Sequence, residues 1–197
     1  MKPASVVIVG AGVMGASVAY HLAVRGWRDV VVFDRSGGPG QGSTGAATGG
    51  FRAQYGTAIN VRLSLMARDR FVRFRDEIGT DPGYVAAGYL WLATSPLELD
   101  ALRAALEVQR AEGLREAGEV GVEDVARINP AVQGAGIIGG VFCPSDGFIA
   151  PLQVLGGYLA AALRSGVRVE WSTDVTGLVR NGSGRIVAVS TSKGTIE

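Results

Sequence analysis

The stretch Ser5-Val6-Val7-Ile8-Val9-Gly10-Ala11-Gly12-Val13-Met14-Gly15 joins a short, uncharged run of mostly β-branched residues to three closely spaced glycines. A run of this kind is typical of a strand that is buried on both faces of a sheet. The glycines allow a sharp turn, a close approach of the backbone to a pyrophosphate, and tight packing of a helix on the sheet. The amides at the start of that helix, Val13 and Met14, would face phosphate at the positive end of the helix dipole. The stretch therefore predicts a phosphate-binding strand–turn–helix unit.

The residues that follow agree with a nucleotide-binding unit. A helix is predicted over 13–25, and it ends at Gly26 before a second strand over 30–33. That strand leads into Asp34, nineteen residues after Gly15, where a carboxylate can accept hydrogen bonds from the ribose hydroxyls of an adenine dinucleotide. A glycine pattern alone is weak evidence in a chain with 30 glycines, but its place between a strand and a helix favours dinucleotide binding.

The composition limits the classes of protein and partner. The 197 residues and the hydrophobic content of 47% fit a globular protein with a substantial core. A net charge of +1 gives no basic footprint for nucleic acid. Cys143 is the only cysteine, which excludes an intrachain disulfide and a cysteine-based zinc site, and we expect no metal. Residues 4–24 carry no charge, but glycines, Tyr20 and His21 interrupt them, so we expect no membrane span and a cytoplasmic protein.

The order of the predicted elements indicates an α/β protein. We expect a Rossmann-like, three-layer domain, with a parallel sheet and a β-hairpin, into which an α+β region is inserted. The helix over 151–165 leads into a strand over 167–171, which is expected to lie parallel to the strand over 30–33 and to give the spatial order 3-2-1. A hairpin over 174–191 would cover this sheet. We expect residues 1–80 and 151–197 to form the nucleotide-binding domain and residues 81–150 to form the inserted domain.

A long helix is predicted over 57–78. Its apolar residues at helical spacing are Ile59, Leu63 and Met66, continued less regularly by Phe71, Phe74 and Ile78. We interpret Ile59, Leu63 and Met66 as one apolar face of this helix.

Four stretches together resemble a known family: 10–15 with Asp34-Arg35, Gly42-Ser43-Thr44, the run 49–57, and Ser145-Asp146-Gly147-Phe148-Ile149-Ala150-Pro151. The chain resembles FAD-dependent oxidoreductases of the D-amino-acid oxidase type. The nearest branch contains glycine oxidase, sarcosine oxidase β subunits and dye-linked proline dehydrogenases. The resemblance runs over nearly the whole chain, and the combination of motifs is more specific than the first motif alone.

The resemblance implies where FAD would bind. The implied contacts are Gly10, Gly12, Val13, Met14 and Gly15 for the pyrophosphate, Asp34 for the adenosine ribose, Arg35 and the backbone of Val175 for adenine, Gly42, Ser43 and Thr44 along the pyrophosphate and ribityl chain, and Gly49, Gly50, Phe51 and Arg52 beside the isoalloxazine. Small residues near a planar flavin let it approach the backbone, and hydroxyl groups can bond phosphate oxygens.

The chain also departs from its apparent relatives. Ile149 stands where flavin-linking sarcosine oxidase subunits have a histidine, and Cys143 does not match the cysteine that holds FAD in monomeric relatives. The resemblance therefore implies non-covalent FAD. Family members are longer and add a strand beside the first one, so the edge of the strand over 5–9 is expected to be uncovered within these residues. We expect a second polypeptide, or self-association, to cover this edge, because uncovered apolar edges aggregate.

The activity that the resemblance implies is oxidation of the C–N bond of a small amino acid or N-methyl amino acid, such as sarcosine, glycine or proline, by hydride transfer to the flavin. No catalytic residue is assigned. Arg52 could pair with a substrate carboxylate or with the reduced flavin, or only brace its loop, and Gln54 could hydrogen-bond nearby. Two alternatives stay open: a non-catalytic FAD-binding subunit that needs a partner chain, and an NAD(P)-dependent dehydrogenase. The long loop after Asp34 argues against the second.

Overall fold

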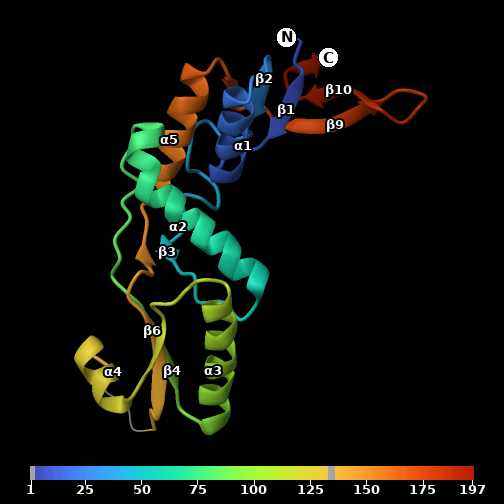
Figure 1. Ribbon diagram of the computed structural model, residues 1–197. Coiled ribbons are helices and arrows are strands. Elements are labelled where there is room, and N and C mark those ends of the chain that lie inside the picture. The colour runs from blue at the N-terminus through green and yellow to red at the C-terminus, as the bar shows by residue number, and fades with distance from the viewer. Residues whose placement is uncertain (1–2, 133–135) are drawn as a thin grey trace. The chain divides into compact units, whose positions relative to one another are not determined.

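The computed structural model describes residues 3–132 and 136–197, and it divides into two compact units (Figure 1). Unit 1 comprises Met1–Thr48, Phe74–Pro82 and Ala150–Glu197, and unit 2 comprises Gly49–Arg73 and Gly83–Ile149. The long helix α2 (Ala58–Ile78) contributes residues to both units. Each unit is described by itself.

Unit 1 is built on a parallel sheet with the strand order β1-β2-β8. Its strands are β1 (Val6–Val9), β2 (Val30–Phe33) and β8 (Arg168–Glu170). Val6 pairs with Val30, and Val31 pairs with Arg168. The predicted order 3-2-1 is therefore confirmed, and β1 lies at the edge of the described sheet.

Two helices and a second sheet cover opposite faces of the parallel sheet, which gives the predicted three layers (Figure 1). Helices α1 (Val13–Val24) and α5 (Pro151–Arg164) pack with Val30 and Val32. Val31 and Phe33, on the other face, pack with Val189 and Ile196 of the second sheet. Strand β2 alternates between these two layers and is buried throughout. Burial on both faces was predicted for β1, but β1 is only partly buried and Val9 is 65% exposed, because β1 has a neighbouring strand on one side only in the described sheet.

The second sheet of unit 1 is antiparallel, with the order β11-β10-β9. Strands β9 (Val175–Arg180) and β10 (Ile186–Thr191) form the predicted hairpin. The strand β11 (Gly194–Ile196) pairs with β10 and was not predicted. Beyond it, the carbonyl of Glu197 accepts a 2.8 Å hydrogen bond from the amide of Ala4.

Unit 2 contains the inserted α+β region. Its antiparallel sheet has the order β4-β6-β5. The elements are β3 (Gly50–Phe51), β4 (Tyr89–Ala93), α3 (Pro96–Ala111), β5 (Gly118–Val120), α4 (Val122–Ile128), β6 (Gly139–Cys143) and β7 (Gly147–Phe148). Strand β3 pairs antiparallel with β7, and residues 49–73 therefore group with 83–149, although we expected them in the nucleotide-binding domain. Two-residue strands carry no periodic signal, so this pairing was not visible in the sequence.

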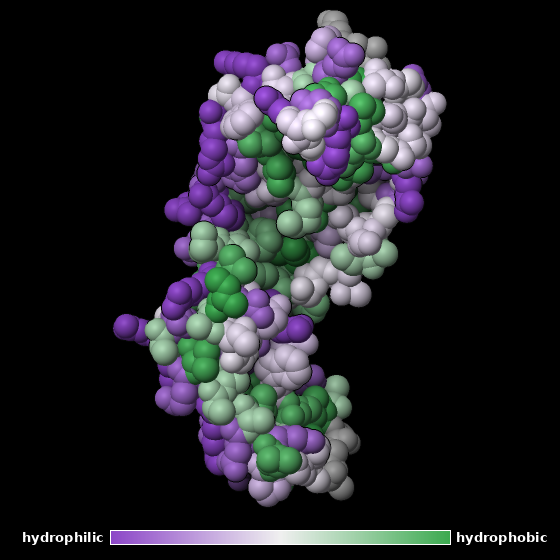
Figure 2. Space-filling view, turned by 90° about the vertical axis from the view of Figure 1, so that its right-hand side faces the viewer, coloured by the Kyte–Doolittle hydropathy of each residue, from purple (hydrophilic) through white to green (hydrophobic). Residues whose placement is uncertain are grey.

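Helix α2 has the predicted position, but its predicted apolar face is exposed. Ile59, Leu63 and Met66 are 60%, 54% and 66% exposed. The buried apolar residues of α2 are Phe74 and Ile78, which belong to the predicted continuation of the stripe, and Val61, which was not predicted. Spacing alone cannot decide which of two apolar stripes on one helix meets the core. Other large apolar residues are also exposed, and Figure 2 shows apolar side chains in patches on one face.

Candidate functional site

A cavity of about 440 Å³ lies at the carboxyl ends of the parallel strands in unit 1. This edge of an open α/β sheet is where such folds bind ligands. Of the predicted FAD-binding residues, the cavity brings together Gly10, Gly12, Asp34, Arg35, Gly42, Ser43, Thr44 and Val175. Val13, Met14 and Gly15 belong to the adjoining first turn of α1 and do not line it.

Two of the glycines are required by the turn between β1 and α1. Gly10 has a φ of +97°, a conformation that side chains with a Cβ rarely adopt. A Cβ on Gly15 would lie 1.9 Å from the carbonyl oxygen of Gly10. The helix can therefore begin immediately after the strand only because residue 15 has no side chain, and this contact places the first turn of the helix next to the cavity.

The donor set at this turn fits a diphosphate. The amide of Val13 donates to the hydroxyl oxygen of Thr44 over 3.1 Å, which fixes Thr44 beside the start of α1. In the part of the chain that the structure describes, the amides of Gly12 and Met14 have no protein acceptor. Unpaired amides at a helix N-terminus are suited to phosphate oxygens, since the helix dipole also favours negative charge there.

Asp34 supplies an ionised acceptor in the same cavity. Its carboxylate accepts hydrogen bonds from the amides of Ala11, at 2.7 Å, and Ser36, at 2.8 Å. Partial burial would raise the pKa of Asp34, but the bonds from Ser36 and Ala11 outweigh it and lower the pKa. Each oxygen keeps a free lone pair, so the carboxylate can accept from ribose hydroxyls as predicted.

Sequence reasoning missed cavity residues that come from the end of β8. Trp171 and Thr173 line the cavity together with Asp174. The amide of Thr173 donates to the carbonyl of Asp34 over 2.8 Å, and this bond joins the two strand ends. A signal was available, because parallel neighbours end at the same edge of a sheet and residues after the third strand must reach the site.

The predicted residues Gly49, Gly50, Phe51 and Arg52 lie in unit 2, where Gly50 and Phe51 form β3. Phe51 is buried and packs edge-on against the rings of Phe71 and Tyr84. The structure thus fixes this stretch within unit 2.

Arg52 lies among three aromatic rings. Its guanidinium carbon is 5.3 Å from the ring centre of Tyr55, 5.7 Å from that of Tyr89 and 5.5 Å from that of Trp91. No carboxylate pairs with Arg52 within residues 3–132 and 136–197, and its Nε is buried without a hydrogen-bond acceptor. Aromatic faces attract a cation but do not neutralise it. The guanidinium therefore retains donors for an anionic ligand.

Gln54, the other candidate, is buried and held by two acceptors. Its Nε2 donates to the carbonyl of Tyr89 over 2.9 Å and to the carboxylate of Asp146 over 3.2 Å. Its Oε1 is buried without a partner among the described residues. The amide nitrogen is thus engaged by protein, and only the oxygen is available to a ligand.

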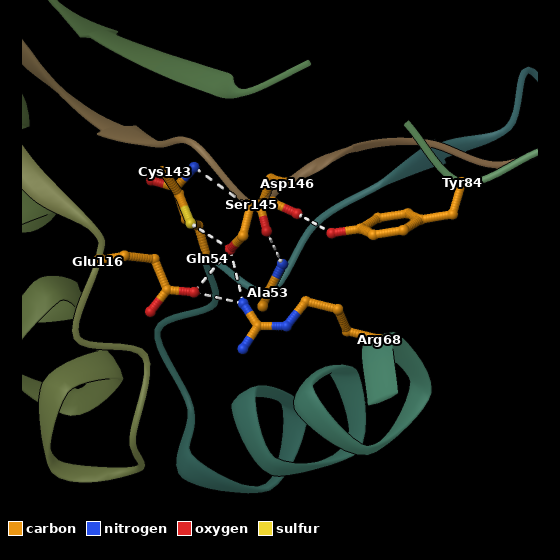
Figure 3. A network of polar contacts seen from close by, with 8 residues as sticks. All are labelled: Ala53, Gln54, Arg68, Tyr84, Glu116, Cys143, Ser145 and Asp146. Carbon is orange, nitrogen blue, oxygen red and sulfur yellow. Dashed lines mark hydrogen bonds and ion pairs between the residues drawn. The ribbon is translucent and has the colours of Figure 1, made fainter. Parts of the chain in front are cut away.

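Asp146 belongs to a polar network that the sequence did not predict (Figure 3). The Asp146 side chain is fully buried, and its Oδ1 accepts from the amide of Ala53 over 2.8 Å. Ser145 beside it bonds the side chains of Arg68 and Glu116, which also pair with each other. These contacts draw the segment after β3, helix α2 and the β6–β7 connection together.

Residues 3–132 and 136–197 contain no group of three metal-ligating side chains. No helix in these ranges is long and apolar enough to cross a membrane.

Comparisons with known proteins agree with this geometry. A family model described as "FAD dependent oxidoreductase" (DAO) matches residues 5–197. The chain is 27% identical over 194 residues to the mitochondrial pyruvate dehydrogenase phosphatase regulatory subunit of Mus musculus, covering 98% of this chain and 22% of that protein. It is 27% identical over 201 residues to sarcosine oxidase subunit beta of Rhodobacter capsulatus, covering 100% of this chain and 48% of that protein.

Among solved structures, L-proline dehydrogenase from P. horikoshii has a TM-score of 0.91 at 25% identity, covering 100% of this chain and 51% of that one. The chain thus spans about half, or less, of the length of the proteins that it matches.

Proposed function

Because this chain belongs to the DAO family of FAD-dependent oxidoreductases, we propose that it contributes to the oxidation of the C–N bond of a small amino acid or N-methyl amino acid. Sarcosine, glycine and proline are the candidate substrates. Sarcosine oxidase subunit beta and L-proline dehydrogenase, the similar proteins named above, support this class of substrate.

The residues of unit 1 would hold FAD without a covalent bond. The unpaired amides of Gly12 and Met14 bind the pyrophosphate, and the ionised carboxylate of Asp34 binds the adenosine ribose. The hydroxyl of Thr44, held by the amide of Val13, can donate its proton to a phosphate oxygen. When bound there, FAD would supply the redox chemistry for oxidation of the substrate C–N bond, and these residues would hold and orient it.

The observation that carries the amino-acid substrate is the environment of Arg52. A partly buried guanidinium that three rings surround, and that no carboxylate of the described residues neutralises, is suited to a substrate carboxylate. The absence of an ion pair in the described residues argues against the possibility that Arg52 only braces its loop. The placement of Gly49–Arg52 beside the isoalloxazine, which the resemblance implies, remains a prediction.

The experiment combines spectroscopy with turnover. We expect the purified chain to bind FAD, with a visible flavin spectrum after gel filtration. Turnover of sarcosine, proline or glycine with a dye acceptor would then support the oxidase. A chain that stays colourless and indifferent to saturating FAD would contradict the proposal.

A second candidate is a non-catalytic FAD-binding subunit. The specific observation is the match to a protein named as a regulatory subunit, over 98% of this chain. FAD binding without turnover of any of the three amines would favour this candidate. The NAD(P)-dependent alternative is disfavoured, since the family is FAD-dependent.

We also propose that another polypeptide strand, from a second chain or by self-association, pairs with the free edge of β1. A groove of about 300 Å³ lies there, lined by β1 and apolar residues of β9 and β10, and Val9 is 65% exposed. The amide of Gly10 donates to Phe33 of β2, so by alternation those of Val7 and Val9 point to the free edge. Rapid exchange of these two amides in a monodisperse monomer would contradict this proposal.

The cytoplasmic location and the domain roles remain predictions.

A further inference from the structure

We propose that Asp146 is a positioning residue that fixes the presentation of Arg52; the inference rests on the proposed role of Arg52 as the receptor of a substrate carboxylate. Asp146 does not contact Arg52 in the structure. It acts through Ala53 and Gln54, the two residues that follow Arg52 in the chain.

The aromatic rings around Arg52 come from two separate segments. Tyr55 lies in the loop after β3, with Arg52 itself, whereas Tyr89 and Trp91 lie on β4. The side chain of Gln54 joins these segments, because its Nε2 donates to the carbonyl of Tyr89. The position of Arg52 between the rings therefore depends on how this amide is oriented.

Asp146 determines that orientation. Its Oδ2 accepts from the same Nε2 of Gln54, and its Oδ1 accepts from the amide of Ala53. An ionised carboxylate can only accept hydrogen bonds, so it selects the amide nitrogen of Gln54 over the oxygen. If the amide of Gln54 were reversed, its Oε1 would face two other acceptors, the carbonyl of Tyr89 and the carboxylate of Asp146. The unpaired, buried Oε1 of Gln54 is the cost of the orientation that is observed.

The charge of Asp146 is not used in an ion pair within the described residues. No arginine or lysine there pairs with it, because the nearby Arg68 bonds to Glu116 and to the hydroxyl of Ser145 (Figure 3). An unpaired buried carboxylate costs stability, and burial raises the pKa of this one. The bonds that it accepts from Ala53 and Gln54 both act on the segment that carries Arg52, and the thiol of Cys143 is a further donor.

The test uses the 197-residue chain with Trp27→Phe and Trp171→Phe, which leaves Trp91 as the only tryptophan. The readouts are Trp91 emission with its quenching by acrylamide, and the Arg52 Nε–H resonance in ¹⁵N NMR spectra. Arg52→Met gives the signal of Trp91 without the guanidinium. We expect Asp146→Asn to shift the Arg52 resonance and to move Trp91 emission and quenching toward the Arg52→Met values. Ser145→Ala, the matched control, removes bonds to Arg68 and Glu116 and should leave both signals unchanged.

Titration of the chain with a small carboxylate ligand separates this inference from the proposed function. Acetate, the probe, should perturb Trp91 emission in the parent chain, with an affinity about tenfold weaker in Asp146→Asn, because misplacing a binding group by a fraction of an ångström costs on this order. If acetate has no effect on any chain while Asp146→Asn still changes the Arg52 and Trp91 signals, the role of Arg52 fails and the positioning stands.

Two results would overturn the positioning role. One is an Asp146→Asn chain that folds with unchanged Arg52 and Trp91 signals, and the other is an equal change in Ser145→Ala. If Asp146→Asn does not fold, the deciding variant is Gln54→Leu. This substitution removes the hydrogen bond to Tyr89 of β4 and leaves Asp146 in place. Unchanged Trp91 emission in Gln54→Leu would reject the proposal, and a shift toward the Arg52→Met value would support it.

Discussion

The carboxylate of Asp34 accepts a hydrogen bond from the backbone amide of Ala11, with an N···O distance of 2.7 Å. The bond ties the end of β2 to the turn that follows β1. It brings the residue that would bind ribose and the residues that would bind phosphate to one place before any ligand arrives. Since the bond also favours the ionised carboxylate, the cavity keeps a negative acceptor beside unpaired amides.

Asp34→Asn removes this charge with little change in size. We expect the affinity for ADP, which carries the diphosphate and ribose of FAD, to fall about tenfold or more, because hydrogen bonds to charged groups contribute about 1.5–3 kcal/mol. Isothermal titration calorimetry with ADP measures the change. Asp29→Asn, an exposed change in the turn before β2, is the control and should bind like the parent chain. Equal affinity in the two variants would contradict the role of Asp34.

Gly15→Ala places a methyl group against the carbonyl of Gly10. The strand and helix must then separate, and we expect the free energy of unfolding to fall by about 1–3 kcal/mol. Urea unfolding measures it. Gly156→Ala, on the exposed side of α5 with open space around the new methyl group, should instead raise stability by about 0.5–1 kcal/mol. The opposite signs of the two changes in unfolding free energy distinguish the effect of close packing from that of helix propensity. A Gly15→Ala chain as stable as the parent would count against the packing argument.

Arg52→Met removes the cation from between Tyr55, Tyr89 and Trp91. We expect binding of a simple carboxylate such as acetate to weaken at least about tenfold, since a charge-assisted contact is lost. NMR chemical-shift titration of the Trp91 indole gives the affinity. Arg110→Met, which removes an exposed arginine of α3 from the same unit, is the control for net charge. Similar weakening in both variants would indicate a general charge effect and not a site.

Asp146 should make stability depend on pH. Burial raises the pKa of this carboxyl above its ordinary value of 3.8, and the bonds from Ala53 and Gln54 oppose the shift without cancelling it. Above pH 3.8 the folded chain therefore retains a proton that the unfolded chain loses, so the stabilisation from protonated Asp146 is lost as pH rises through the raised pKa. We expect the unfolding free energy of the parent chain, relative to Asp146→Asn, to decrease over this range. Urea unfolding of both chains at several pH values tests it, and a constant or rising difference would contradict it.

The strand–turn–helix unit and its sheet could be predicted from the sequence because the signals are local. β1 and β2 are uncharged β-branched runs, and glycines or turn residues bound them. The strands β3, β5, β7 and β11 could not be predicted. Each has two or three residues, and only the partner strand, far away in the sequence for β3 and β7, makes it a strand.

The candidate site likewise contains residues that could be predicted from the sequence and residues that could not. Gly10, Gly12 and Asp34 were predicted because their spacing carries the chemistry of nucleotide binding. Trp171 and Thr173 reach the same cavity from more than 130 residues further along the chain, and no local pattern marks them. The contacts of Asp146 with Ala53 and Gln54 likewise span more than 90 residues, so they become visible only once β3 and β7 are paired.

The division of this chain into units has a practical meaning for anyone who wishes to dissect it. The backbone passes from one unit to the other four times, after residues 48, 73, 82 and 149. Neither unit is a continuous piece, so no single proteolytic cut or truncated clone can isolate the nucleotide cavity from the segment that carries Arg52. Exchanging unit 2 between relatives would require two separate grafts, one for 49–73 and one for 83–149, and the first graft would have to be joined inside α2, between residues 73 and 74.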